Sequence, residues 1–145
     1  MPKVTYDSNL FIKRMPACFP AGIYMSIVVL QELVAGAPDT STIKEIQAAK
    51  RKYETLGRLL VPDSEDWWTV GLVINSLQRG RRSKKTGMIP KMAAEERFRI
   101  TNDVLIARTA KRAGVTVVTD NIKDFRKIQN FCNVSFISGA KFFGR

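Results

Sequence analysis

Short β-forming segments alternate with helical segments along the whole chain, and this alternation restricts the fold more than any other feature. It is typical of α/β folds, in which crossover helices join parallel strands. A length of 145 residues corresponds to one domain. We therefore expect residues 1–145 to form a single three-layer α/β/α sandwich with a mainly parallel central sheet. Ligands of such sheets bind at the carboxyl ends of the strands.

The strands are predicted from apolar and β-branched runs that are bounded by turn-forming residues. The first strand is expected over residues 3–7 and ends at Asp7. Further strands are expected over residues 23–26, 115–119 and 134–138. Residues 59–63 are either a strand or an extended link.

The helices are predicted from apolar spacing and from residues that favour helix ends. A first helix begins near Asn9 and is broken by the proline-rich residues 16–20. Ser26 caps the next helix, which Gly36 and Pro38 end.

The clearest helical pattern covers residues 40–60, with a capping box of Thr42 and Glu45 at its start. Gly114 is expected to end a later helix. The starts of the remaining helices are expected at Ser64, at Thr101 and at Asn121.

The chain contains no histidine, and this absence excludes several classes of enzyme. A Ser-His-Asp triad, a Cys-His pair, imidazole acid–base catalysis and a histidine-ligated zinc site are all ruled out. The two cysteines, Cys18 and Cys132, have no metal-binding spacing and are interpreted as buried or incidental thiols. Hydrolytic chemistry in this chain would therefore depend on carboxylates, together with a hard metal ion.

Basic residues outnumber acidic ones, with 24 Lys and Arg against 13 Asp and Glu and a net charge of +11. This excess favours a polyanionic partner such as nucleic acid. Several basic residues fall in one loop over residues 78–91, where they either grip an RNA backbone beside an acidic site or form a solvated surface. They are Arg79, Arg81, Arg82, Lys84, Lys85 and Lys91.

Trp67 and Trp68 are adjacent, so at most one of them faces the core of a helical layer. Packing in the core or in an interface is the favoured interpretation, and stacking on a base is the alternative. No apolar run is long enough to span a bilayer, and the first ten residues lack the apolar core of a signal peptide. We therefore expect a cytoplasmic protein with no membrane partner.

The few carboxylates fall at informative places. Asp7 and Asp120 follow predicted strands, Asp103 lies in the predicted first turn of a helix, Glu32 interrupts an apolar helix, and Asp124 opens the last helix. Gathered at one sheet edge, they would need a cation such as Mg²⁺, which prefers oxygen ligands. Taken singly, they are also explained as turn residues or as favourable charges at helix starts.

Four segments resemble motifs of the PIN-domain family, in the same order. The segments are Asp7-Ser8-Asn9, with Ser in place of the family's usual Thr, Ser26–Gly36 (SIVVLQELVAG), Thr101–Ala110 (TNDVLIARTA) and Val117–Phe125 (VVTDNIKDF). Together they span nearly the whole chain. Within the family, the length resembles that of VapC-like toxins, which are ribonucleases of bacterial toxin–antitoxin pairs.

The resemblance implies a site that binds Mg²⁺ or Mn²⁺ through Asp7 and Asp103, with Asp124 as the favoured fourth acid and Asp120 as the alternative. Glu32 would act through metal-bound water, as a base or as an orienting group. A supporting set of polar side chains would hold the acids in place. It consists of Ser8, Asn9 and Thr119.

The resemblance also implies a metal-dependent endoribonuclease that acts as a toxin, and with it an RNA substrate and a cognate antitoxin. We further expect a homodimer. A non-catalytic basic RNA-binding protein on the same fold is the alternative. A receiver-type signalling domain is weaker still, because it needs adjacent acids after the first strand, whereas Asp7 is followed by Ser8 and Asn9.

Overall fold

The computed structural model describes residues 3–13 and 22–144 of the chain, and its strands form a parallel sheet. The strands are β1 (Val4–Tyr6), β2 (Met25–Ser26), β3 (Leu59–Leu60), β4 (Thr116–Val118) and β5 (Phe136–Ile137). β4 pairs with β1 on one side and with β5 on the other, and β2 pairs with β3. A parallel bridge between Thr5 and Tyr24 joins the two groups. The order β3-β2-β1-β4-β5 confirms the predicted parallel sheet.

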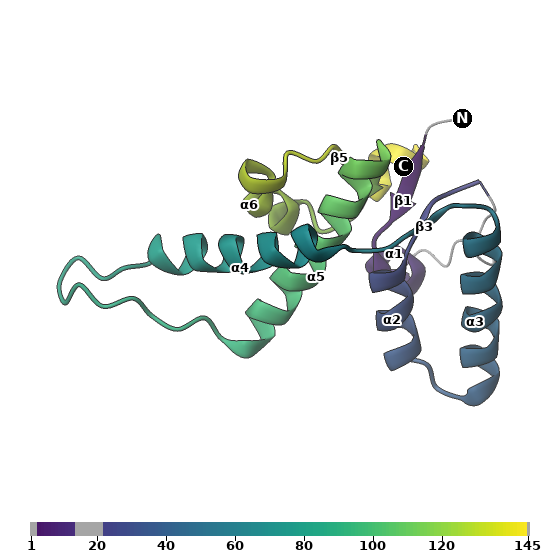
Figure 1. Cartoon of the computed structure of the whole chain (residues 1–145), viewed down its shortest axis with the longest axis horizontal. Helices are drawn as coiled ribbons and strands as arrows, with labels where there is room; N and C mark the ends of the chain where they lie inside the picture. Colours follow the sequence, from purple (N-terminus) through teal and green to yellow (C-terminus); the bar gives the residue numbers. More distant parts are fainter. Residues whose placement is uncertain (1–2, 14–21, 145) are drawn as a thin grey trace.

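Helices connect the strands and cover both faces of the sheet (Figure 1). They are α1 (Ser8–Lys13), α2 (Ile27–Ala35), α3 (Thr40–Thr55), α4 (Ser64–Arg79), α5 (Ala94–Ala113), α6 (Ile122–Cys132) and α7 (Gly139–Phe143). On one face the ring of Tyr6 contacts Phe11 of α1 and both Phe142 and Phe143 of α7. The other helical layer contains α5, which packs against α4, α6 and β4. The predicted three-layer sandwich is confirmed.

The core lies between these layers and is built from apolar residues of the strands and of α5. Val117 of β4 and Val104, Ile106 and Ala107 of α5 are fully buried. Because apolar surface is removed from water on several sides of α5, this helix is held firmly in the centre of the domain. It therefore provides a rigid support for any side chain that it directs toward the end of the sheet.

Ser26 caps α2 as predicted, since its hydroxyl accepts hydrogen bonds from the amides of Val28 and Val29. The predicted box of Thr42 and Glu45 is wrong, because Asp39 caps α3 and accepts a 2.8 Å hydrogen bond from the Thr42 amide. α3 ends at Thr55, before Gly57 adopts a left-handed conformation with φ of 68°. The chain then turns into β3, which covers Leu59 and Leu60, while residues 61–63 belong to no strand. The predicted helix over residues 40–60 is therefore too long.

The cap of α4 is Asp63 rather than Ser64. Asp63 accepts from the Asp66 amide, and the Asp66 carboxylate accepts from the Asp63 amide in return. The prediction that Thr101 starts a helix is also wrong, because α5 begins at Ala94. Thr101 lies inside that helix and donates its hydroxyl to the Arg97 carbonyl at 2.7 Å. Gly114 ends α5 in a left-handed conformation, as predicted.

The proline-rich residues 16–20 and Cys18 lie outside the described residues. Cys132 is a buried free thiol, in agreement with its interpretation from the sequence. Among the described residues, no helix combines the length and the apolar character that crossing a bilayer requires.

Candidate functional site

A small pocket at the carboxyl ends of β1 and β4 brings three of the predicted acids together. It has a volume of about 160 Å³ and is called the acidic pocket below. Its lining residues are Asp7, Ser8, Asn9, Glu32, Phe98, Arg99, Asn102, Asp103 and Asn121. Asp7 and Asp103 are only 4% and 7% exposed, and Glu32 is half-buried. The pocket therefore holds carboxylates that are largely removed from water.

Asp7 follows β1 directly and is held by donors from three neighbours. The Ser8 amide donates to its Oδ1 at 2.8 Å, the Asn9 amide nitrogen Nδ2 to its Oδ2 at 3.4 Å, and the Thr119 hydroxyl to Oδ2 at 2.8 Å. These are the three residues for which a supporting role is expected. Burial nevertheless raises the pKa of Asp7, because loss of hydration outweighs the hydrogen bonds that stabilise its ionised form.

Asp103 lies in the middle of α5 and not in a first turn. Its pKa is raised to about 8, first by burial and then by the negative charges of Asp7, Asp124 and Glu32. The positive charge of Arg99 acts in the opposite direction. Without a cation, this carboxyl group therefore favours its neutral form at pH 7.

Glu32 reaches the same pocket from α2. Its Oε2 accepts a 3.1 Å hydrogen bond from the Ser8 hydroxyl. Burial raises the pKa of Glu32, the charge of Asp7 raises it further, and the Ser8 hydrogen bond lowers it. Ser8 thus contacts two acids, through its amide on Asp7 and through its hydroxyl on Glu32.

Asp120 and Asp124 lie near the pocket without lining it. Asp124 accepts a 2.7 Å hydrogen bond from Asn121 Nδ2, and Asp120 accepts one of 3.1 Å from the Gly139 amide. The charge of Asp124 raises the pKa of both Asp7 and Asp103. The charge of Asp120 also raises the pKa of Asp7, by less than the charge of Asp124 does. Asp124 is therefore more closely coupled to the pocket.

The pocket offers a suitable donor set for a hard divalent metal. The side-chain oxygen Oδ1 of Asn9 is buried and has no hydrogen-bond partner among the described residues. Residues 3–13 and 22–144 contain no group of three or more His, Cys, Asp or Glu side chains arranged to bind a metal. Mg²⁺ does not need such a cage, since it is often bound by one or two carboxylates and keeps several waters. Asp7, Asp103 and the free Asn9 oxygen fit that mode.

Sequence reasoning missed four of the lining residues, which are Phe98, Arg99, Asn102 and Asn121. Arg99 precedes Asp103 by four residues, so both lie on one face of a helix. That spacing was available in the sequence. A helix that begins only at Thr101, as the sequence predicts, does not include Arg99, whereas α5 begins at Ala94.

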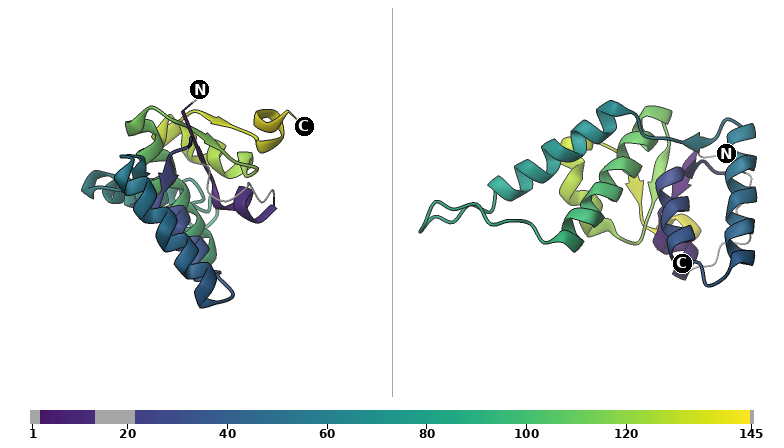
Figure 2. Two further views of the ribbon diagram at one scale, coloured as in Figure 1. Left: turned by 90° about the vertical axis from the view of Figure 1, so that its right-hand side faces the viewer. Right: turned by 60° about the horizontal axis from the view of Figure 1, so that its bottom comes forward.

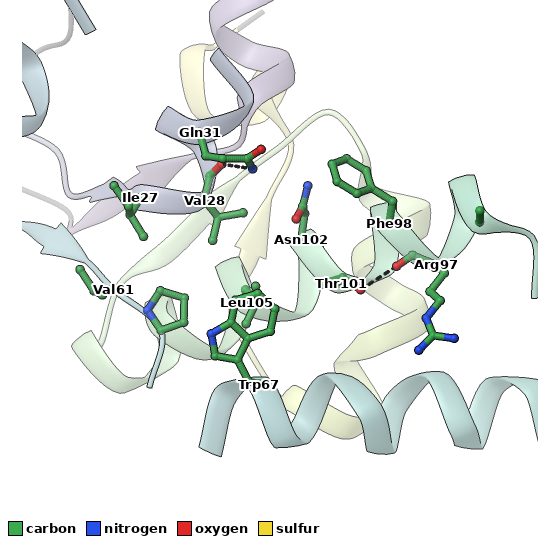
Figure 3. A pocket seen from close by; sticks show the side chains of 12 residues that line it. Ile27, Val28, Gln31, Val61, Trp67, Arg97, Phe98, Thr101, Asn102 and Leu105 are labelled. Carbon is green, nitrogen blue, oxygen red and sulfur yellow. Dashed lines mark hydrogen bonds between the residues drawn. The ribbon is translucent and has the colours of Figure 1, made fainter. Parts of the chain in front are cut away.

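A larger cavity of about 700 Å³ adjoins the acidic pocket, and it is called the apolar cavity below. Phe98 and Asn102 line both spaces. Figure 3 shows Asn102 and Phe98 on the α5 side, Gln31 and Val28 on α2, and Trp67 on α4. Trp67 and Trp68 are 57% and 66% exposed, so neither packs in the core, whereas packing in an interface and stacking on a base stay predictions.

The basic loop between α4 and α5 projects from the body of the domain at the far ends of these helices (Figures 1 and 2). Its residues do not line the acidic pocket, and both the grip on an RNA backbone and the solvated surface stay predictions. Arg81 makes a two-pronged ion pair with Glu96, with both contacts at 2.7 Å. Arg82 donates to the Gly87 carbonyl at 3.3 Å. Arg79, Lys84, Lys85 and Lys91 are exposed.

The fold is shared with solved structures of low sequence identity. The chain resembles VapBC-1 from nontypeable Haemophilus influenzae with a TM-score of 0.54 and 21% identity, over 93% of this chain and 96% of that one. It resembles DNA-bound VapBC from Salmonella typhimurium with a TM-score of 0.53 and 22% identity, over 95% and 98% of the two chains.

A third similar structure is FitAB bound to an IR36 DNA fragment, with a TM-score of 0.52, 17% identity and 94% of each chain covered. No curated protein sequence matches the chain significantly. The family model of the PIN domain matches residues 6–130, which include every acid discussed above. The chain therefore belongs to the PIN-domain family.

Proposed function

We propose that this protein is a metal-dependent endoribonuclease that hydrolyses RNA phosphodiesters in the acidic pocket, and that it is the toxin of a toxin–antitoxin pair. Membership of the PIN-domain family supports a nuclease, since members are generally nucleases that use divalent metal ions. The fold shared with VapBC-1, VapBC and FitAB supports the toxin assignment.

The observation that carries the proposal is the burial of Asp7 and Asp103 in one pocket. Burial raises the pKa of both carboxyl groups and the negative charges of neighbouring acids raise it further, so the pocket destabilises their ionised forms when no cation is present. A structural role does not explain such a pair, because buried carboxylates of purely structural importance are normally paired with cations. A divalent metal would relieve the repulsion and stabilise both charges.

We propose a role for each acid. Asp7 and Asp103 would bind the metal directly, and Asp124 would act as the fourth acid in preference to Asp120. When bound, Mg²⁺ or Mn²⁺ supplies a positive charge that polarises the phosphate and stabilises developing negative charge. Glu32, whose raised pKa favours proton uptake, would accept a proton from an attacking water or orient it.

Three polar residues would keep the acids in position for this reaction. Thr119 and Asn9 donate to Asp7, and Ser8 links Asp7 to Glu32. Hydrogen bonds of this kind fix the orientation of a carboxylate before the metal binds, which lowers the cost of arranging the site.

The test of the enzymatic proposal is incubation of the purified protein with total cellular RNA. One sample contains Mg²⁺, one Mn²⁺ and one EDTA, and the cut ends are mapped. We expect internal cuts with either metal and none with EDTA. The alternative, a non-catalytic RNA-binding protein on the same fold, predicts a retarded but intact RNA under all three conditions.

The partner proposed for the toxin is a cognate antitoxin of acidic overall character, with an Arg or Lys side chain that enters the acidic pocket. The net charge of +11 supports an acidic partner, and the carboxylates support a basic side chain at that one point. Co-expression of the protein encoded immediately upstream should suppress both growth inhibition and RNA cleavage. Unchanged toxicity under co-expression would contradict this part of the proposal.

The proposed homodimer has its best support on α4, where Trp68 and Leu72 lie one helical turn apart and are 66% and 52% exposed. Large apolar side chains exposed side by side often mark an interface. Light scattering on the purified protein gives the oligomeric state directly. Trp68→Ser should shift a dimer toward the monomer, and an unchanged dimer would exclude this surface as the interface.

A further inference from the structure

Arg99 is a cation at the acidic pocket to which the proposed chemistry gives no role. It lines the pocket together with Asp7, Glu32 and Asp103. Its position four residues before Asp103 places both side chains on the same face of α5. The guanidinium is close enough for its charge to act on Asp103, although the side chain is exposed.

Several arginines of this domain are engaged in ion pairs, and Arg99 is not among them. Arg81 pairs with Glu96, and Arg108 and Arg112 pair with Asp66. Within residues 3–13 and 22–144, no carboxylate lies within ion-pair distance of Arg99. Its donors are therefore available to a ligand that enters the pocket.

A cationic side chain at the acidic pocket favours the approach of an RNA phosphodiester, in addition to the proposed metal ion. Three carboxylates line the pocket, and they repel the negative charge of a phosphate. Arg99 is the one basic side chain among the described lining residues. A planar guanidinium matches two oxygens of a phosphate with two parallel hydrogen bonds, which a lysine ammonium does not reproduce.

We propose that Arg99 binds the phosphodiester of the RNA substrate at the acidic pocket and so positions it against Asp7, Glu32 and Asp103. This inference rests on the proposed function, since it takes RNA as the substrate. The competing explanation is that Arg99 only offsets the negative charge of the acids. The two explanations differ in what happens to RNA binding when the acids are already partly neutralised.

The chain offers a matched control in Arg97, which lies two residues earlier on α5 and is also exposed. Arg97 lines the apolar cavity and not the acidic pocket. In Figure 3 its guanidinium points away from Asn102 and Gln31. Arg97→Gln and Arg99→Gln therefore remove the same charge from neighbouring positions, but only the second removes it from the acidic pocket.

The experiment measures binding of a fluorescently labelled single-stranded RNA by anisotropy in an Asp103→Asn background, which suppresses cleavage. We expect Arg99→Gln to weaken binding about tenfold, the effect of losing charge-assisted hydrogen bonds. It should also make the salt dependence shallower by about 0.7 for one lost contact. Arg97→Gln should change the affinity less than about twofold, and Arg99→Lys should recover part of the loss.

Equal affinities for Arg97→Gln and Arg99→Gln would overturn the proposal, because only net charge would then matter. A rate measurement in the wild-type background with Mg²⁺ separates this failure from failure of the proposed function. Unchanged KM and kcat for Arg99→Gln, in a protein that cleaves RNA, would reject Arg99 alone. A wild-type protein that neither binds nor cleaves RNA would reject the proposed function, and the assignment of Arg99 with it.

Discussion

The hydroxyl of Thr119 donates a 2.8 Å hydrogen bond to Oδ2 of Asp7 and so connects the ends of β4 and β1, which are adjacent in the sheet but 112 residues apart in sequence. Thr119 is fully buried, and its own Oγ1 accepts a hydrogen bond from the Asn121 amide at 2.9 Å. The bond lowers the pKa of Asp7 against the opposing effect of burial. Thr119 thus favours the ionised state of Asp7, which the proposed metal binding requires.

Thr119→Val should reduce RNA cleavage and shift the rise of activity toward higher pH. The valine side chain is similar in shape but cannot donate to Asp7, so the pKa of Asp7 rises further and a higher pH is needed to ionise it. A pH–rate profile measures the shift. Thr119→Ser retains a hydroxyl and serves as the control, and coincident profiles for wild type and Thr119→Val would contradict this role of the bond.

Asp103→Asn should make the metal-free protein more stable at neutral and alkaline pH. The pKa of Asp103 is about 8 in the folded protein and 3.8 in the reference state, so folding is increasingly penalised as pH rises from about 4 to 8. Asparagine removes this penalty. In EDTA at pH 8 we expect the variant's Tm to exceed that of the wild type by about 3 °C or more. This shift corresponds to a gain of about 1 kcal/mol or more in the free energy of unfolding.

The same difference in Tm should vanish as pH falls below about 4, because Asp103 is then protonated in the unfolded chain as well as in the folded protein and no penalty remains. Added Mg²⁺ should raise the Tm of the wild type and have little effect on Asp103→Asn. A Tm difference that is constant from pH 4 to pH 8 would show that the carboxyl group of Asp103 carries no such penalty.

The acids could be predicted from the sequence because they lie at the ends of predicted strands or within recognisable motifs. The residue at which α5 begins could not be predicted. α5 begins after Ala93, which makes no side-chain cap, so its first two turns have no start signal of the kind that Ser26 gives to α2. A helix that starts at Thr101 does not contain Arg99, so the sequence did not predict Arg99 as part of the site. The start of α5 is marked only by the acidic residues Glu95 and Glu96 in the first turn, and packing of α5 against α4 stabilises the extra turns.

Asp66 provides the clearest case of a structural role that no motif predicted. Its carboxylate is fully buried and accepts from Arg112 at 2.9 and 2.7 Å and from Arg108 at 3.1 Å, so it fastens α4 to α5. These cations lie far from it in sequence. Only the packing of the two helices brings them together.

Asp66→Asn should lower the free energy of unfolding by about 2 kcal/mol at pH 7, as measured by urea denaturation. The arginines hold the pKa of Asp66 at about 2, against an ordinary value of 3.8, although burial opposes them. The ionised Asp66 carboxylate therefore contributes fully to the free energy of unfolding above pH 4, and this contribution is lost as pH falls toward 2. Glu54→Gln, which breaks the exposed pair with Lys50, should cost less than about 0.5 kcal/mol. Equal losses for the two variants would contradict the assignment.

The double variant Lys84→Ala/Lys85→Ala tests whether the basic loop contacts RNA. Arg81 is engaged with Glu96, so the exposed lysines are the better probes of this loop. If both contact phosphates, binding should weaken for all RNA sequences, and the salt slope should fall by up to about 1.4. Lys44→Ala/Arg51→Ala removes the same charge from the exposed surface of α3 and is the control. A slope equal to that of the control would identify the loop as a solvated surface.

The central claim is that Asp7 and Asp103 form a metal-dependent catalytic pocket, and the most direct test is the initial rate of cleavage of a defined RNA. With Mg²⁺ the wild type should cleave, EDTA should abolish the reaction, and an excess of Mg²⁺ should restore it. Asp7→Asn and Asp103→Asn should be inactive with Mg²⁺ while remaining at least as stable to heat as the metal-free wild type. Cleavage that persists in EDTA, or full activity in both variants, would contradict the account.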